Sequence, residues 1–374
     1  MRVIVIGAGL GGLALAQSLL RAGVAVDVYE RDAGLEARFQ GYRIGLGDRG
    51  LPALKRCLPE RLHPLLHAVS GDMAGEGRAV DTRLNELGRT PVQDEGLLFD
   101  RHVLRHLLHA GLDGHVHFGK RFDAYEPLPG GGVRAFFDDG TTVTGDLLVG
   151  ADGMGSAVCR QLLPSVEILD TGVAGVIGRT PLTPELAPLV PGWSTLVQDG
   201  NLNLFIGKMP FRRPPHEAAA ELAPDVKLPE TSSYLRWVLL LPPGAHEASE
   251  EVRDGVDFVA DLVRGWHPLL RAMIREADRG NSGLGPIRYA DPLPAWEPGP
   301  VTLLGDSAHP MPPGGLGANL AFQDAVSLRD ELAPVARGEA PLLPALAAHQ
   351  QRMRDTAASV HSAAMATLRM ITRT

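Results

Sequence analysis

Residues 1–31, MRVIVIGAGLGGLALAQSLLRAGVAVDVYER, decide the fold of this chain. Val3–Ile6 is a short run of β-branched residues and predicts a buried strand. Leu13–Ala22 places apolar side chains at helical spacing, and Gly23 ends that helix. Val24–Glu30 predicts a second strand. A strand, a glycine turn, a helix and a strand within about 30 residues open a doubly wound α/β sheet.

The glycines of this segment follow the spacing Gly7-x-Gly9-x-x-Gly12, between the first strand and the helix. Glycines in that position let backbone amides approach a pyrophosphate at the helix N-terminus. Glu30 ends the second strand, where a carboxylate accepts hydrogen bonds from the ribose of a dinucleotide. By itself this fingerprint suits FAD and NAD equally. Its predicted contacts are Gly7, Gly9, Leu10, Gly11, Gly12, Glu30 and Arg31.

Two further apolar strands end in glycine-rich loops. Asp146–Gly150 leads into GADGMGS at residues 150–156, and Val301–Gly305 leads into GDSAHP at residues 305–310. Ligands of open α/β sheets bind beyond the carboxyl ends of the strands. Both loops are therefore expected at the same edge as the N-terminal glycine turn.

The three loops, in this order and spacing, resemble the signatures of the class A flavoprotein monooxygenases, the 4-hydroxybenzoate hydroxylase-like family. The resemblance covers residues 1–165 and 285–335 well and the middle of the chain loosely. It implies FAD as cofactor and NADH or NADPH as reductant. It also implies that O2 reacts through a flavin C4a-hydroperoxide to hydroxylate an aromatic or polycyclic hydrophobic small molecule. The single dinucleotide fingerprint suits this family, in which NAD(P)H has no Rossmann domain of its own.

The resemblance also implies roles for residues of the second and third loops. Asp306 would accept hydrogen bonds from the ribityl chain of FAD, and residues 310–319 would pass beside the flavin ring. Asp152 would lie near the pyrophosphate, orienting backbone amides and one arginine, for which Arg160, Arg43 and Arg101 are the candidates. The chemistry is borne by the flavin, so no catalytic side chain is required. The expected cofactor contacts outside the fingerprint are Arg43, Arg101, Asp152, Asp306, Pro313, Gly315, Gly317, Ala318 and Asn319. His309 adjoins this loop, either as a packed, hydrogen-bonded histidine or as a proton relay.

The middle of the chain predicts a separate, mainly antiparallel sheet. Its expected strands are Ala174–Thr180, Ser194–Val197, Leu202–Lys208 and Tyr234–Leu241, and a helix is expected from Pro341 to about Arg369. The predicted fold is α/β, with a Rossmann-type FAD-binding domain (residues 1–70, 96–165 and 285–340), an antiparallel substrate-binding domain (71–95 and 166–284) and a long C-terminal helix (341–374). Candidate substrate contacts are Phe205, Phe211, Tyr234 and Trp237, with Trp193 as a further one.

Composition and charge argue against nucleic acid and an anionic membrane surface as partners. The formal net charge of -8 offers no footprint for nucleic acid. Cys57 and Cys159 are the only cysteines, too few for a disulfide framework, and this favours a reducing cytoplasm. Glycines split the apolar opening segment, so neither a signal peptide nor a membrane span is expected. Oligomeric state and the choice of nicotinamide cofactor stay open.

Several alternatives compete with this interpretation. His102, His106 and His109 share one face of a predicted helix, but no carboxylate or cysteine of the sequence pattern completes a metal site with them. An FAD-dependent dehydrogenase or halogenase would use the same fold. A halogenase is disfavoured because its Trp-x-Trp-x-Ile-Pro signature is absent and no lysine falls in the cofactor loops. A non-catalytic flavin-fold protein that sequesters a small molecule is the rival from another class.

Overall fold

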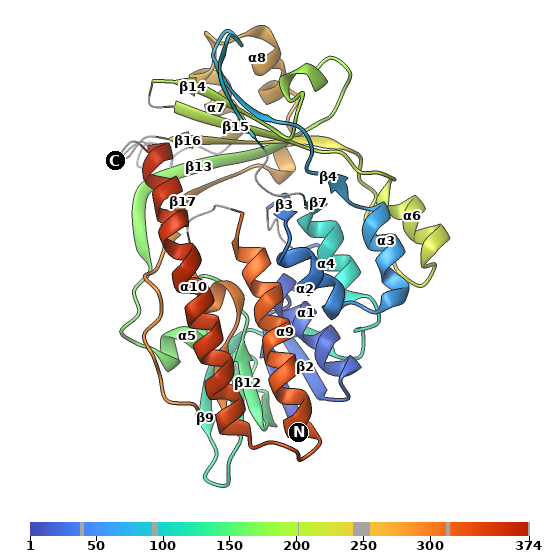
Figure 1. Cartoon of the computed structure of the whole chain (residues 1–374), viewed down its shortest axis with the longest axis vertical. Helices are drawn as coiled ribbons and strands as arrows, with labels where there is room; N and C mark the ends of the chain where they lie inside the picture. Colours follow the sequence, from blue (N-terminus) through green and yellow to red (C-terminus); the bar gives the residue numbers. More distant parts are fainter. Residues whose placement is uncertain (38–40, 92–95, 201, 242–254, 312–314, 373–374) are drawn as a thin grey trace.

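A parallel five-stranded sheet forms the centre of one half of the molecule (Figure 1). The computed structural model describes residues 1–37, 41–91, 96–200, 202–241, 255–311 and 315–372. The strand order is β18 (Val301–Leu303), β12 (Leu147–Gly150), β1 (Arg2–Ile6), β2 (Ala25–Glu30) and β8 (Val116–Phe118). Every neighbouring pair in this sheet is parallel. The Rossmann-type interpretation is therefore confirmed.

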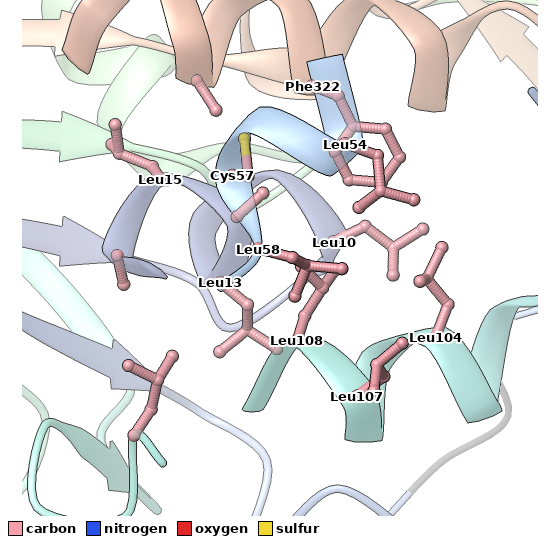
Figure 2. Packing of buried hydrophobic residues seen from close by; sticks show 14 of the residues in the cluster. Leu10, Leu13, Leu15, Leu54, Cys57, Leu58, Leu104, Leu107, Leu108 and Phe322 are labelled. Carbon is pink, nitrogen blue, oxygen red and sulfur yellow. The ribbon is translucent and has the colours of Figure 1, made fainter. Parts of the chain in front are cut away.

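Helices cover one face of this sheet with a leucine-rich core. They are α1 (Leu10–Arg21), α2 (Gly50–Cys57), α4 (Arg101–His109) and α9 (Gly317–Ala336). Figure 2 shows Leu10 of α1 among Leu54, Leu104 and Phe322 of the other three helices. Burying such side chains fully stabilises a fold by about 1.5–3 kcal/mol each. Helix α10 (Leu342–Thr372) packs beside α9 and runs along this half of the molecule (Figure 1).

The opposite face is covered by smaller elements. A three-stranded sheet of β9 (Phe122–Pro127), β10 (Val133–Phe137) and β11 (Thr142–Gly145) packs there with α5 (Ala157–Leu162). Elsewhere α3 (His63–Ala68) packs on α6 (Pro215–Leu222), and single 3-10 turns span Glu60–Leu62, Ala187–Leu189, Arg279–Asn281 and Gly305–Ser307. Both faces of the parallel sheet are thus enclosed, as such sheets require.

A second large sheet lies across one end of the molecule (Figure 1). Its order is β17 (Gly283–Tyr289), β13 (Leu169–Pro181), β16 (Tyr234–Leu241), β15 (Leu202–Met209), β14 (Ser194–Asp199), β5 (Gly77–Asp81) and β6 (Glu86–Thr90). Only the β14–β5 pair is parallel, which confirms a mainly antiparallel sheet. Helices α7 (Gly255–Leu262) and α8 (Pro268–Arg275) pack on one of its faces.

A three-stranded sheet, which the sequence pattern does not predict, lies between these two halves. It contains β3 (Arg43–Leu46), β7 (Leu97–Asp100) and β4 (Gly71–Asp72). In Figure 1 these strands lie beneath the large antiparallel sheet, above α4 and α2. Side chains of this small sheet, among them Arg43 and Asp100, contact the large antiparallel sheet.

Most predicted elements are confirmed with small changes of length. Strand β16 has the predicted bounds, and α10 starts one residue after the predicted Pro341 and runs past Arg369. Strand β17 extends the antiparallel sheet to Tyr289, beyond the predicted boundary at residue 284, and the domain boundaries stay a prediction. Among the described residues, no helix is both long and apolar enough to cross a bilayer.

Candidate functional site

The three glycine loops meet at the carboxyl edge of the parallel sheet. A Cβ atom built on Gly7 would lie 2.4 Å from the Ala151 carbonyl oxygen, so the first two loops are in backbone contact. The Gly153 amide donates to Ser307 Oγ at 2.9 Å, which joins the second loop to the third. The sequence prediction that these loops share one edge is therefore confirmed.

The N-terminal glycines differ in whether there is space for a Cβ atom. A Cβ on Gly12 would lie 2.0 Å from the Gly7 carbonyl oxygen, whereas no described atom comes within 4 Å of a Cβ on Gly9. Gly7 itself has a φ of 109°, which favours glycine. Helix α1 has no side-chain cap and no acidic residue in its first turn. Its free amides and the open edge at Gly9 fit a diphosphate. Leu10 is buried, Gly11 packs on Leu304, and Arg31 is exposed.

Glu30 is 5% exposed and is tied to the glycine loop. Its carboxylate accepts hydrogen bonds from the Ala8 amide at 2.7 Å and the Asp32 amide at 2.9 Å. Arg105, which sequence reasoning missed, lies 3.7 Å from this carboxylate and donates to the Ala8 carbonyl at 2.8 Å. The only sequence signal for Arg105 was a charged residue among the apolar positions of α4. The role of Glu30 toward a ribose stays a prediction.

Asp152 organises its own loop through backbone and hydroxyl donors. It accepts from Ser156 Oγ at 2.5 Å, from the Ala157 amide at 2.7 Å and from Ser307 Oγ at 3.2 Å. The expectation that it orients backbone amides is met, but the expected arginine partner is wrong. No ion pair to Asp152 occurs in the described part of the chain, because these three donors surround the carboxylate. Arg160 instead donates to the Gly155 carbonyl at 2.6 Å.

The third loop brings Asp306 to the start of α9. A Cβ on Gly317 would lie 2.9 Å from Asp306 Oδ1, and this partly exposed carboxylate accepts no hydrogen bond from the described residues. Asn319 joins α9 to β3: its amide donates to the Gly45 carbonyl at 3.0 Å. Gly315 has a φ of 80°, and Ala318 packs against the leucine-rich core. Pro313 lies outside the described residues.

A buried polar cluster supports the third loop from below. His309 is 5% exposed, and its Nε2 lies 3.0 Å from Asp324 Oδ2, which also accepts from the Gly305 amide at 3.0 Å. His309 is therefore a packed, hydrogen-bonded histidine in this structure. His349 of α10 is fully buried beside Ser327, and burial lowers its pKa to about 4. Asp324 was missed, although a charged residue on an apolar helix face was its signal.

The candidate substrate residues separate onto two faces of the antiparallel sheet. Tyr234 is buried, its hydroxyl donates to Asp100 Oδ2 at 2.7 Å, and burial raises the pKa of Tyr234 well above its usual value. Phe211 meets Tyr234 edge-on, with ring centroids 6.4 Å apart. Trp237 lies three residues further along β16 and so faces the core under α7 and α8, fully buried and bonded to Thr180. The structure thus groups Tyr234 with Phe211 and separates Trp237 from both.

Phe205, a candidate substrate contact, and Arg43, a candidate cofactor contact, lie on or beside the face of the antiparallel sheet that carries Tyr234, here called the Tyr234 side. Phe205 is partly buried and packs against Leu240, Ile287 and Val238. Arg43 was expected at the cofactor, but the structure places its guanidinium against the antiparallel sheet. Its Nη1 donates to the carbonyls of Trp193 at 3.2 Å and Lys208 at 2.9 Å. Arg101, at the start of α4, donates its amide to the Tyr42 carbonyl at 2.6 Å.

The histidines of α4 do have a carboxylate neighbour, contrary to the sequence argument. Glu36 lies 2.8 Å from His102 Nε2 and 2.9 Å from His106 Nε2, and the three possible ligand atoms lie within 4.8 Å of one another. Sequence spacing missed it because Glu36 comes from the segment after β2. Burial lowers the pKa of His106, with the charge of His102 adding to the effect. These contacts hold that segment against α4.

Comparisons with known proteins agree with this geometry. The family model described as FAD binding domain matches residues 1–199 and 288–363. A dual O-methyltransferase/FAD-dependent monooxygenase of Cercospora beticola is 32% identical over 402 residues, covering 95% of this chain and 44% of that protein. The chain thus spans less than half the length of the first curated relatives it matches. An FAD-dependent urate hydroxylase of Klebsiella pneumoniae is 29% identical over 343 residues, covering 88% of this chain and 80% of that protein.

One solved structure matches along nearly the whole length. It is a Photorhabdus luminescens protein provisionally described as an FAD containing monooxygenase. The two chains are 31% identical, the TM-score is 0.82, and the match covers 100% of this chain and 98% of the other. The overall fold of this chain is therefore shared with that protein.

Proposed function

Since the chain belongs to the FAD-binding-domain family of class A flavin-dependent monooxygenases, we propose that it uses NADH or NADPH and O2 to hydroxylate an aromatic or polycyclic small molecule. The observation that carries the proposal is the junction of the three glycine loops. Gly9 leaves an open backbone edge there, and Asp306 presents a carboxylate without a described partner. Such an edge suits the diphosphate of FAD, and such a carboxylate suits its ribityl hydroxyls.

Each part of the junction has a separate task in this proposal. The amides of α1 hold the diphosphate, and Asp306 accepts from the ribityl chain. Helix α9 begins beside Asp306, so its free amides and dipole stabilise negative charge on the reduced ring. FAD, when bound, supplies the redox chemistry, and the protein binds, orients and excludes water.

The antiparallel sheet provides the cover for the reacting part of the substrate. Its Tyr234 side looks toward β3, which Asn319 ties to the start of α9. The aromatic candidates for substrate contact on or beside this side are Phe205, Phe211 and Tyr234. Trp237 is assigned to the core and not to the substrate site. A cytoplasmic location is part of the proposal, supported by two free, buried cysteines.

Oxygen incorporation separates this function from its rivals. The purified protein should carry FAD, and aromatic substrates should stimulate oxidation of NADH or NADPH with one 18O atom from 18O2 in the product. A dehydrogenase would oxidise its substrate without gaining 18O, and a halogenase would require halide. A flavin protein that binds the panel without turnover of any kind would be a non-catalytic binder.

The Asp306→Ala variant tests the cofactor assignment directly. Loss of a carboxylate that accepts from ribityl hydroxyls should weaken FAD binding by about 10- to 100-fold, since hydrogen bonds to charged groups contribute about 1.5–3 kcal/mol. Asp330→Ala is the matched control, because Asp330 lies on the exposed side of α9 and pairs with Arg56. Titration of each apoprotein with FAD measures the effect. Equal FAD affinities in both variants would refute the assignment of Asp306.

A further inference from the structure

Two arginines from different halves of the molecule meet on the Tyr234 side of the antiparallel sheet. Arg236 of β16 is paired in register with Gly207 of β15, so the two residues point to the same face. A Cβ on Gly207 would lie 2.6 Å from Arg43 Nη2, which shows that the guanidinium of Arg43 fills the space above Gly207. The two guanidinium groups are therefore neighbours on one face.

No carboxylate neutralises this pair in the described part of the structure. Among the described residues, the guanidinium of Arg43 donates only to the carbonyls of Trp193 and Lys208, and the side chain of Arg236 makes neither a hydrogen bond nor an ion pair. The proximity of Arg236, together with burial as the larger cause, lowers the pKa of Arg43 to about 10. Burial also lowers the pKa of Arg236.

The acidic groups nearby already have partners. Arg179 is paired in register with Arg236, but it binds Asp278 at 3.0 Å. Asp100 accepts from the Tyr234 hydroxyl and from the Val103 amide. Both arginines are partly buried, and two like charges withdrawn from water without a counter-charge are unfavourable, a cost that a bound anion would relieve.

The arginine pair lies close to the proposed flavin position. Strand β3 carries Arg43 at its first residue, and Gly45, two residues later, accepts a hydrogen bond from Asn319 at the start of α9. Two residues of a strand span about 7 Å. An anion held by Arg43 and Arg236 would therefore lie within the length of a one- or two-ring molecule from the flavin loop.

We propose that Arg43 and Arg236 bind an anionic oxygen group of the substrate, a carboxylate or a conjugated enolate, so that the substrate is an aromatic anion. This inference rests on the proposed function for the position of the flavin, and it replaces a purely hydrophobic substrate with a charged one. Guanidinium groups present planar, paired donors that match such oxygens. Trp193, whose ring centroid lies 5.9 Å from the Arg43 Cζ, adds an aromatic wall beside them.

Calorimetric titration with 2-naphthoate and its neutral isostere 2-naphthamide tests the proposal. The FAD-loaded protein should bind naphthoate at least about tenfold more tightly than naphthamide. Arg236→Gln and Arg43→Gln should each lose about 10- to 100-fold in naphthoate affinity and keep FAD. Arg288→Gln, which removes an exposed arginine paired with Asp170, is the control and should change nothing.

The ligand-free proteins provide a second readout. Since Arg236 is an unneutralised charge, Arg236→Gln should not lower the melting temperature, whereas a merely structural arginine would lower it when removed. Equal affinity for naphthoate and naphthamide, or an unchanged naphthoate affinity in a folded Arg236→Gln protein, would overturn the proposal. A selective loss of NADPH binding in Arg236→Gln would also overturn the proposal, because the two arginines would then bind a phosphate of the cofactor and not the substrate. A protein that binds naphthoate through both arginines but holds no FAD would refute the proposed function and leave the anion site standing.

Discussion

The two large sheets of this protein present their proposed ligand-binding groups in different ways. At the parallel sheet, the groups are backbone edges and short loops, fixed by glycines within a few residues of a strand end. At the antiparallel sheet, they are side chains such as Arg43 and Arg236, which come from strands far apart in the chain. The first kind of site depends on the absence of Cβ atoms, and the second depends on charge and tertiary packing. The two should therefore respond differently to mutation.

The largest effect is expected inside the N-terminal glycine turn. In Gly12→Ala the new Cβ would lie 2.0 Å from the Gly7 carbonyl oxygen, so the backbone must move. We expect a loss of about 4 kcal/mol or more in the free energy of unfolding, together with loss of FAD. Urea unfolding followed by circular dichroism measures the first, and flavin absorbance measures the second.

Gly9→Ala is the control, because its Cβ meets no described atom. Its stability without FAD should stay within about 1 kcal/mol of the parent. Its FAD affinity should nevertheless fall, since the methyl group would occupy the edge assigned to the diphosphate. If Gly9→Ala binds FAD as the parent does, the diphosphate does not lie at that edge.

This division also explains how much could be predicted from the sequence. The turn at Gly7, the loops at Asp152 and Asp306 and strand β16 were placed correctly, because each is specified by neighbours within one strand or turn. The open backbone edge at Gly9, where the diphosphate is proposed to bind, follows from the same local spacing. Local sequence thus determines the strands and turns of the parallel-sheet half, but not tertiary partners such as Arg105 and Asp324.

The antiparallel half could not be predicted to the same depth. The Arg43 guanidinium lies above Gly207, and nothing in the sequence near either residue relates positions so far apart. The aromatic ring of Trp237 suggests a substrate contact, but the register of β16 places it in the core. A shift of one residue along a strand moves a side chain to the other face of the sheet. An apolar strand that is covered on both faces has no alternating pattern from which the face could be predicted.

The second-largest effect is expected on the pH dependence of unfolding, through His349 in the parallel-sheet half. The pKa of His349 is lowered to about 4 by burial, while an unfolded histidine titrates near 6.5. Between those values the unfolded chain binds a proton that the folded chain does not, so stability falls as pH drops from about 6.5 to 4. The loss should be on the order of 3 kcal/mol. Urea unfolding at several pH values between 7 and 4 measures it.

The surroundings of His349 define the control for this prediction. Burial is the largest influence and lowers the pKa of His349, as do Arg352 and His309, whereas Asp324 and a hydrogen bond with the Leu303 backbone raise it. His349→Gln should flatten the pH profile of stability over this range. A profile that stays as steep in His349→Gln would assign the acid sensitivity to another group.

A smaller effect is expected at the one hydrogen bond described here between side chains of β16 and β7. Tyr234→Phe removes the donor that reaches Asp100 Oδ2 at 2.7 Å and leaves the buried carboxylate with the Val103 amide. We expect a loss of about 1–2 kcal/mol in unfolding free energy. Combining this variant with Asp100→Asn in a double-mutant cycle isolates the pair. Tyr125→Phe, in the β9 sheet, is the control and should lose less than half as much; equal losses would mean that the Asp100 contact contributes nothing.

The smallest effect on stability is expected for Gly207→Ala, where Arg43 packs against the antiparallel sheet. In Gly207→Ala the new Cβ would lie 2.6 Å from Arg43 Nη2. A guanidinium is the end of a flexible side chain, so it can withdraw, at the cost of its bonds to Trp193 and Lys208. Unfolding free energy should fall by only about 1 kcal/mol. Affinity for 2-naphthoate should fall more steeply, because the displaced charge no longer lies beside Arg236.

Gly175→Ala supplies the matched control, because it lies in the same sheet and its Cβ would meet side chains at 3.5 Å and 3.6 Å, ordinary contact distances. Its stability and its naphthoate affinity should both match those of the parent. If Gly207→Ala loses several kcal/mol, the space above Gly207 is rigid and the contrast between the two sheets fails. If it loses neither stability nor affinity, Arg43 does not depend on that space. Only the split result, a small loss of stability with a large loss of anion binding, fits a site formed by side-chain charge.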